Sequence, residues 1–420
     1  MAGVLPGVEQ EEIRDEEPLV EHDPQGIREG GKPSKIAGEN PGNFVITESL
    51  GLGEGTDGEK ISRNLEAIRT LRTLQKENRY PTREEQAVMA RYVGWGGLKP
   101  VFDIRKKGAT DMYGRAQEEL RQLLSPAEYN AAFKSTTDAH YTAKGIVDAM
   151  WRVVRHLGFR GGLALEPTVG TGNFLGLQPA DLAASTEWHA SELDTITGQL
   201  AAMLYPNANV LASTGFQDAP FADNAFDLAI GNPPFGQTTI STRNPRLKSL
   251  NGMKIHNYII AKTGAHLRPG GVMTVVVTHR FLDTANPEAR DVLAKSFRFL
   301  GAFRLPNNAF QANAGTRVVT DVVMFQKLRP GESPDTNAAW LDVNGRLENG
   351  IRVNKYYQEN PTHILGNSTM GGKMHARAEA PEYTVESDGR DLGEAIDGLI
   401  SGDFADLAGI MDAIPADKNT

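Results

Sequence analysis

The sequence contains no cysteine among its 420 residues. It can therefore form neither a disulfide framework nor a thiolate metal site, and we expect a cytoplasmic protein without a bound metal. No uninterrupted apolar run approaches the roughly 20 residues needed to cross a bilayer, and the acidic N-terminus lacks the basic-then-apolar order of a secretion signal. We expect no contact with a membrane, and 40% apolar residues suffice for a sizeable core.

Positive charge is scarce over the whole chain, whose net charge is −9, but it is unevenly distributed. Residues 237–330 carry 14 Lys and Arg against 4 Asp and Glu, whereas residues 1–44 and 331–420 are acidic. This basic block directly follows a sequence of asparagine, two prolines and phenylalanine. A phosphate backbone is therefore expected to meet the protein at this block.

Changes of pattern divide the chain into four segments. Residues 1–44 are rich in Glu, Asp, Pro and Gly without a hydrophobic period and are predicted to be a disordered acidic tail. Residues 45–135 show helical spacing and are predicted to be a helical N-terminal region. Residues 136–330 alternate between strands and helices, which predicts a mainly parallel sheet covered on both faces. Residues 331–420 form an acidic C-terminal appendage in this interpretation.

The helical region carries two helix-start signals and one unusual aromatic motif. Thr82 and Ser125 each precede a glutamate by three residues, as in a capping box. Trp95 lies among glycines, and we interpret it as a packing residue rather than a substrate contact.

The predicted strand that begins near Asp227 ends abruptly at Asn232-Pro233-Pro234-Phe235. Neither proline can donate to a ladder, so the chain must leave the sheet there. The result is a rigid platform with an amide, a free carbonyl and an aromatic ring at the carboxyl edge, where open α/β folds bind ligands. These groups could hold a flat heterocycle that carries an exocyclic amine. The alternative is a proline-rich turn beside a core aromatic.

Two further strand ends carry acids. Glu166 ends a short buried-type strand and is followed by Pro167, Gly170, Gly172 and Phe174, a glycine-bearing loop that leads into a helix. Such glycines let a ligand lie against bare backbone, and Glu166 can meet a cation.

About twenty residues later Glu192 ends the next strand, the usual position for a carboxylate that accepts ribose hydroxyls. The loop has no P-loop lysine, so a nucleoside without phosphate fits better than a nucleotide.

Together these pieces resemble the amino-group DNA methyltransferases that use S-adenosylmethionine. The order that carries the resemblance is His140-Tyr141-Thr142, then Glu166 to Phe174, then Glu192, then Asn232 to Phe235. More narrowly, the runs Tyr92 to Leu98, Ser191 to Gly198 and Leu305 to Thr316 look like the methylase half of DarB-type antirestriction proteins of phages and mobile elements, over roughly residues 60–365.

The resemblance implies an α/β, Rossmann-like class I methyltransferase fold: a mainly parallel seven-stranded sheet with an antiparallel hairpin, after a helical N-terminal region. It implies an adenine-specific DNA methyltransferase that protects DNA from restriction, with double-stranded DNA as substrate. Relatives commonly carry a helicase half behind the methylase half, so a helicase or another antirestriction component in trans is one alternative here; sequence missing here and no translocation at all are the others. The catalytic platform would be Asn232, Pro233, Pro234 and Phe235. The implied S-adenosylmethionine contacts are Tyr141, Thr142, Glu166, Pro167, Gly170, Gly172, Phe174, Glu192, Leu193, Phe216 and Asn232.

The same resemblance implies residues that meet the DNA. Phe310 would stack on the flipped base, and Arg304, Arg317, Lys248 and Arg246 would contact phosphates. The chain departs from the family at Gly215-Phe216, where relatives often carry an acid before the phenylalanine; Asp218 is a possible substitute.

Other amine substrates remain open alternatives. A cytosine amine presents the same two N–H bonds, and ribosomal-RNA guanine methylases and protein-glutamine methylases share the platform sequence. A non-catalytic DNA-binding module that shields DNA belongs to a different class, but such a module has no use for Glu192 or Asn232.

Overall fold

The computed structural model describes residues 36–411, apart from 104, 106, 137–141, 237, 243–244, 311–317 and 373–381. From Ile36 onward the described residues belong to one compact unit. The segments on either side of residues 135 and 330 fall within this unit, so the predicted domain boundaries at these points stay a prediction.

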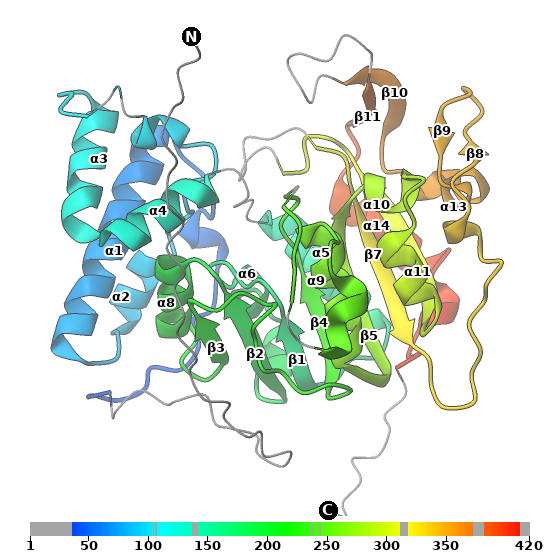
Figure 1. Cartoon of the computed structure of the whole chain (residues 1–420), viewed down its shortest axis with the longest axis horizontal. Helices are drawn as coiled ribbons and strands as arrows, with labels where there is room; N and C mark the ends of the chain where they lie inside the picture. The colour runs from blue at the N-terminus through cyan, green and yellow to red at the C-terminus, as the bar shows by residue number, and fades with distance from the viewer. Residues whose placement is uncertain are drawn as a thin grey trace, which may run out of the picture. The chain divides into compact units, whose positions relative to one another are not determined.

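A seven-stranded sheet with the strand order β3-β2-β1-β4-β5-β7-β6 forms the centre of the fold (Figure 1). β7 runs antiparallel to β5 and β6, whereas β3, β2, β1, β4 and β5 pair in parallel. The predicted α/β architecture, a mainly parallel seven-stranded sheet with an antiparallel hairpin, is confirmed. The strands are β1 (Gly162–Glu166), β2 (Thr186–Glu192), β3 (Asn209–Ala212), β4 (Phe226–Gly231), β5 (Leu267–Thr278), β6 (Phe297–Leu305) and β7 (Thr320–Lys327).

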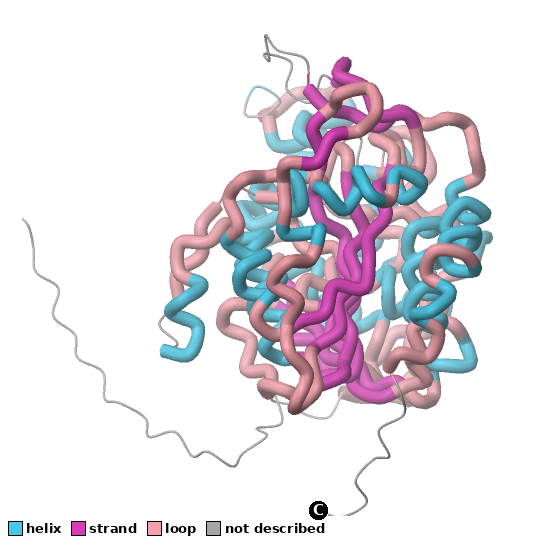
Figure 2. The backbone as a smooth tube through the Cα atoms, turned by 90° about the vertical axis from the view of Figure 1, so that its right-hand side faces the viewer, coloured by secondary structure: helices cyan, strands magenta, loops and turns pink. Residues whose placement is uncertain are grey.

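Helices lie on both sides of the sheet (Figure 2). β5 shows why, because its side chains alternate between two apolar cores. Val272 and Val276 face the core that includes α5 (Lys144–His156), while Met273 and Val275 face the core that includes α9 (Ile255–His266). The other helices of this part are α6 (Asn173–Gly176), α7 (Ala180–Ala183), α8 (Thr195–Leu204), α10 (Arg280–Asp283) and α11 (Glu288–Ala294).

The helical N-terminal region contains α1 (Asp57–Glu77), α2 (Arg83–Met89), α3 (Met112–Leu123) and α4 (Pro126–Ser135). Both predicted capping boxes are present, at Thr82 and at Ser125. Trp95 is fully buried with its ring centroid 5.5 Å from that of Phe102, so its role is packing, as interpreted from the sequence. Among the helices described, none is long and apolar enough to cross a membrane.

The C-terminal segment packs into the same unit. Its elements are β8 (Gly345–Arg346), β9 (Arg352–Val353), α13 (Lys355–Glu359), β10 (Asn367–Gly372), β11 (Glu382–Glu386) and α14 (Leu392–Ser401). Trp340, Val353 and Tyr357 are buried in the core that includes α9. α14 is tied to α5 by an ion pair of 2.6 Å between Arg152 Nε and Asp397 Oδ1.

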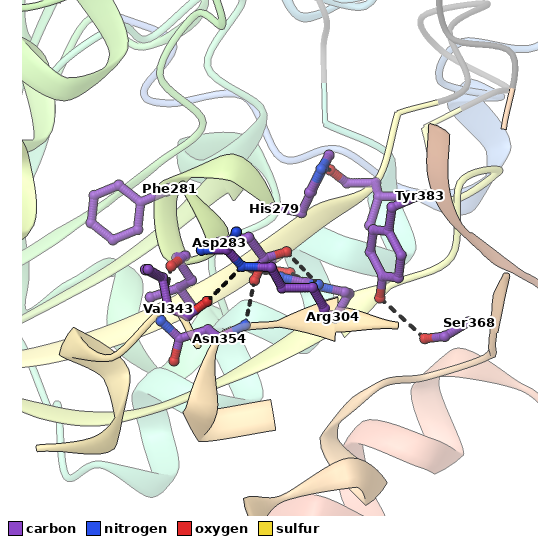
Figure 3. Close-up of polar contacts among 12 residues, drawn as sticks. His279, Phe281, Asp283, Arg304, Val343, Asn354, Ser368 and Tyr383 are labelled. Carbon is purple, nitrogen blue, oxygen red and sulfur yellow. Dashed lines mark hydrogen bonds and ion pairs between the residues drawn. The ribbon is translucent and has the colours of Figure 1, made fainter. Parts of the chain in front are cut away.

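Arg304 connects this segment to the sheet (Figure 3). Its guanidinium, which is fully buried, donates to both carboxylate oxygens of Asp321 at 2.7 and 2.9 Å and to Asp283 Oδ2 at 2.8 Å. The other oxygen of Asp283 accepts the backbone N–H of Asn354 at 2.8 Å, and the Tyr357 ring lies 4.3 Å from the Arg304 guanidinium carbon. The prediction that Arg304 contacts DNA phosphate is therefore wrong, because its charge is neutralised by two aspartates out of reach of solvent.

Candidate active site

A cavity of about 600 Å³ opens at the carboxyl edge of the sheet, where β1, β2 and β4 end. From the strand ends and adjoining loops it is lined by Glu166, Pro167, Thr168, Val169, Gly170, Asn173, Phe174, Glu192, Leu193, Asp194, Asn232 and Pro234. Thr142, Thr197, Gly215, Phe216, Gln217, Ile255 and Ile259 complete this side. The parallel arrangement of β2, β1 and β4 explains the convergence, since their carboxyl ends meet at one edge. Most of the predicted cofactor contacts thus share one cavity.

The platform begins where β4 ends. Gly231 pairs with Val275 of β5, and the next residues leave the ladder at the two prolines, as predicted. Asn232 and Pro234 border the cavity. Phe235 is half-buried instead, with its ring centroid 5.4 Å from that of His256 on α9. Burial lowers the pKa of His256 to about 4, so a neutral imidazole supports the platform.

Glu166 has one carboxylate oxygen, Oε2, that is buried in the described structure without a hydrogen-bond partner. The side chain is 2% exposed and borders the cavity. Burial, together with the nearby charge of Glu192, raises the pKa of Glu166 well above its ordinary value. Buried oxygens of this kind normally have a hydrogen-bond partner, and a cationic group of a ligand in the cavity would supply one and favour the ionised carboxylate.

Glu192 is held by the backbone of the loops beside it. Its Oε2 accepts the N–H of Gly170 at 2.9 Å, and its Oε1 accepts the N–H of Asp194 at 2.9 Å. Burial raises the pKa of Glu192 to about 7, although these N–H bonds oppose the shift. Asp194 caps α8 by accepting the N–H of Thr197 at 2.8 Å. The two bonds fix the Glu192 carboxylate toward the cavity.

The two glycines of the first loop have different roles. Gly170, at φ 55°, borders the cavity and donates to Glu192. Gly172, at φ 79°, does not line the cavity, and a Cβ there would lie 2.2 Å from the ring of Tyr205. This glycine makes room for the tyrosine beneath the loop, and its predicted cofactor contact stays a prediction.

Apolar side chains form the walls beyond the acids. Leu193 is 65% exposed and borders the cavity, and so does the buried Phe216. Asp218 is exposed and lines a neighbouring cavity of about 460 Å³ instead. Its suggested role as a substitute cofactor contact stays a prediction.

The sequence analysis missed one wall of the cavity. Ala127, Asn130, Ala131 and Lys134 of α4 border it. Their spacing of three and four residues places them on one helical face. The capping box at Ser125 identified the helix, but the short side chains of this face carried no signal of a ligand.

The expected DNA contacts are only partly placed. Phe310 is 1% exposed and belongs to a hydrophobic core, so the prediction that it stacks on a base is wrong: neither face of its ring is accessible. Tyr141, Arg317 and the side chain of Arg246 lie outside the described residues. Lys248 is exposed in a short 3-10 helix, Pro245–Leu250.

Comparison with known proteins gives one sequence relative. The chain is 32% identical over 212 residues to "Defense against restriction protein B" of Escherichia phage P1, a match that covers 50% of this chain and 9% of that protein. The chain thus spans less than a tenth of the relative it matches. No protein-family profile matches it.

Solved structures with a similar fold include two bacterial proteins. A structure from Listeria monocytogenes, described as a class I S-adenosylmethionine-dependent methyltransferase, has a TM-score of 0.40 at 17% identity and covers 67% of this chain and 92% of its own. The methyltransferase subunit of a type I restriction-modification system from Streptococcus thermophilus has a TM-score of 0.39 at 20% identity, covering 69% and 68%.

Proposed function

We propose that the protein is an S-adenosylmethionine-dependent DNA methyltransferase that methylates the exocyclic amine of adenine. The observation that carries this proposal is the convergence of Asn232, Glu192 and Glu166 on one cavity at the carboxyl edge. The relationship to a phage protein named for defence against restriction supports a role in protecting DNA.

The cavity fits the proposed cofactor in charge and shape. Glu166 offers a buried, unsatisfied acceptor for a cationic group, and Glu192 offers a backbone-anchored carboxylate for ribose hydroxyls. Leu193 and Phe216 supply apolar walls for a flat ring. S-adenosylmethionine supplies a methyl group on a sulfonium, which is an excellent leaving group.

The remaining catalytic requirement is to activate the amine of the base. Its lone pair is delocalised into the ring, which makes it a poor nucleophile. In our proposal Asn232 Oδ1 and the Pro233 carbonyl each accept one N–H, which localises the lone pair and stabilises the positive charge that develops on nitrogen. The excess proton then passes to solvent, so no strong general base is needed.

The basic block contributes fewer DNA contacts than its composition suggests. Lys262, Arg290 and Arg304 are buried, and Arg268 and Arg298 are paired with Asp227 and Glu332. Lys254 and Arg280 are exposed instead, next to the elements that support the platform.

Lys254 and Arg280 each lie close in sequence to an aromatic side chain of the cluster that includes Phe235 of the platform. Lys254 directly precedes α9, two residues before His256. His256 contacts both Phe235 and Phe281, at 5.4 and 6.3 Å between ring centroids. Arg280 directly precedes Phe281. We propose that Lys254 and Arg280, together with Lys248, contact the phosphates that flank a base flipped toward Asn232.

One labelling experiment tests the proposed function against its rivals. The purified protein and its Asn232→Ala variant are incubated with methyl-labelled cofactor and unmethylated DNA, RNA or a protein extract, and the products are digested and separated. We expect N6-methyladenine from DNA with the wild type alone. Label in cytosine, in RNA guanine or in glutamine would show that this group, and not adenine, is the substrate. DNA binding without any methyl transfer would favour a non-catalytic module that shields DNA.

A further inference from the structure

Lys262 of α9 is a buried cation that the proposed chemistry does not use. It is 2% exposed, and its ammonium group donates to three backbone carbonyls of a single turn. These belong to Phe216, to Gln217 at 3.2 Å and to Ala219 at 3.5 Å. Nζ also lies 4.7 Å from the centroid of the Phe216 ring. One side chain thus holds both the backbone and the ring of this turn.

The turn that Lys262 holds is a wall of the cofactor cavity. Gly215, Phe216 and Gln217 all border the cavity. Converging carbonyls disfavour one another unless a donor lies between them, and the ammonium group of Lys262 is that donor. The Phe216 carbonyl also accepts the N–H of Ala219 at 3.3 Å, so the loss of Lys262 would fall mainly on the carbonyls of Gln217 and Ala219. Removing it would release the part of the turn that faces the ligand.

We propose that Lys262 is a positioning residue for the cofactor: it fixes the turn from Gly215 to Ala219 so that Phe216 is held as a preformed wall for the flat ring of S-adenosylmethionine. The inference rests on the proposed function, because the ligand is the cofactor named there. A preformed wall improves affinity, since the ordering of the turn does not have to accompany binding.

The bonds by which Lys262 fixes the turn should depend on pH. Burial lowers the pKa of Lys262 to about 8, and the charges of Asp218 and Asp223 partly oppose the shift. Both aspartates and His266 line the same neighbouring cavity as Lys262. Above pH 8 the amine loses its charge and with it the strong bonds to the three carbonyls, so cofactor affinity should fall while the pH rises from about 7.5 to about 9.5.

Lys327 provides a matched control. Burial lowers its pKa too, and its ammonium group also donates to backbone carbonyls, those of Gly264, Ala265 and Leu267, at 3.0, 3.3 and 2.7 Å. It does not border the cofactor cavity. Lys327→Met therefore removes a comparable set of bonds without touching the proposed ligand site.

The test is calorimetric titration with S-adenosylmethionine and S-adenosylhomocysteine, beside thermal unfolding of the same samples. We expect Lys262→Met to weaken cofactor binding about tenfold at pH 7.5, the effect of losing roughly one charge-assisted hydrogen bond. Lys327→Met should lower the melting temperature but leave the dissociation constant unchanged. Lys262→Arg should keep the cofactor affinity at pH 7.5 and at pH 9.5, because the adjoining cavity of about 460 Å³ leaves room for a guanidinium that stays charged.

The outcomes separate this inference from the proposed function. Equal dissociation constants for the wild type, Lys262→Met and Lys327→Met would overturn the positioning role alone, as would a wild-type affinity that stays constant up to pH 9.5. Failure of the wild type to bind either nucleoside would overturn the proposed function and this inference together.

Discussion

Cofactor affinity should depend on pH through Glu192. Its pKa of about 7 and its position in the cavity mean that the ionised carboxylate, which best accepts two hydroxyls, forms only near neutral pH. The sign follows from the raised pKa: the acceptor is present above pH 7 and is lost as the pH falls through 7. Binding should therefore weaken toward acid.

The magnitude follows from the ionised fraction. With a pKa of about 7, roughly nine-tenths of the Glu192 side chains are charged at pH 8 and roughly one-tenth at pH 6. If only the charged form binds, the apparent dissociation constant rises about tenfold across this interval, or about 1.4 kcal/mol. Titration calorimetry at pH 6, 7 and 8 measures it directly.

Two variants make the result specific to Glu192. Glu192→Gln should bind weakly and with little dependence on pH, because its amide cannot ionise. Glu187→Gln, on the same strand but exposed, should behave as the wild type does. A wild-type cofactor affinity that is equal at pH 6 and pH 8 would refute the reasoning. A pH dependence that persists in Glu192→Gln would indicate that Glu166, not Glu192, is the group whose ionisation controls binding.

Three further predictions concern the platform, the core and the DNA. Asn232→Ala should abolish methyl transfer with nearly unchanged cofactor affinity; parallel loss of both in activity and titration assays would contradict its placement against the base. Phe310→Ala should lower the free energy of unfolding by about 3–5 kcal/mol, while activity per folded molecule stays near normal; a selective loss of activity at unchanged melting temperature would restore a substrate role. The double variant Lys254→Ala, Arg280→Ala should weaken DNA binding and reduce the salt dependence of the binding constant by the contribution of about two ion contacts. Lys295→Ala, which removes another exposed lysine, should do neither; equal effects of the double variant and Lys295→Ala would show a non-specific response to charge.

The strand ends were predictable because they depend on local order. A buried-type strand followed by an acid or by two prolines must deliver those residues to the carboxyl edge once the strands are parallel. Glu166, Glu192 and Asn232 border one cavity for this reason. The sheet follows from the same alternation of strands and helices, which needs no knowledge of distant contacts.

The burial of Arg304 and Phe310 could not be predicted from the neighbouring residues in the sequence. Both sit in or just after a strand followed by polar residues, a pattern typical of an exposed loop. Arg304 is buried by partners far along the chain: Asp321 is 17 residues away, and the C-terminal segment adds the ring of Tyr357. Asn354 of the same segment donates to Asp283, the second carboxylate that binds Arg304. Burial at such a position depends on which distant segment covers it. The acidic composition of the C-terminal segment suggested an appendage and did not indicate that the segment packs against the sheet.

The wall from α4 was hidden for a related reason. The helix itself follows from its capping box, but its orientation is set by contacts with other elements, including an ion pair of 2.6 Å between Arg72 of α1 and Glu128 of α4. Only that placement turns Asn130 and Ala131 toward the ends of β1 and β2. A face of short side chains is a poor signal in sequence, although it is what a wall around a bulky ligand requires.

The charge of the completed cavity decides between classes of ligand. Glu166, Glu192 and Asp194 line it, and among its described lining residues Lys134 alone carries a positive charge. Burial raises the pKa of all three acids, so each would gain from a cation and all would disfavour a ligand of net negative charge. A nucleotide with phosphates would place its negative charge among these carboxyls. A nucleoside that carries an ammonium and a sulfonium against a single carboxylate has a net positive charge and compensates them, which is why the acids of this edge favour S-adenosylmethionine over a dinucleotide although the sheet resembles those that bind both.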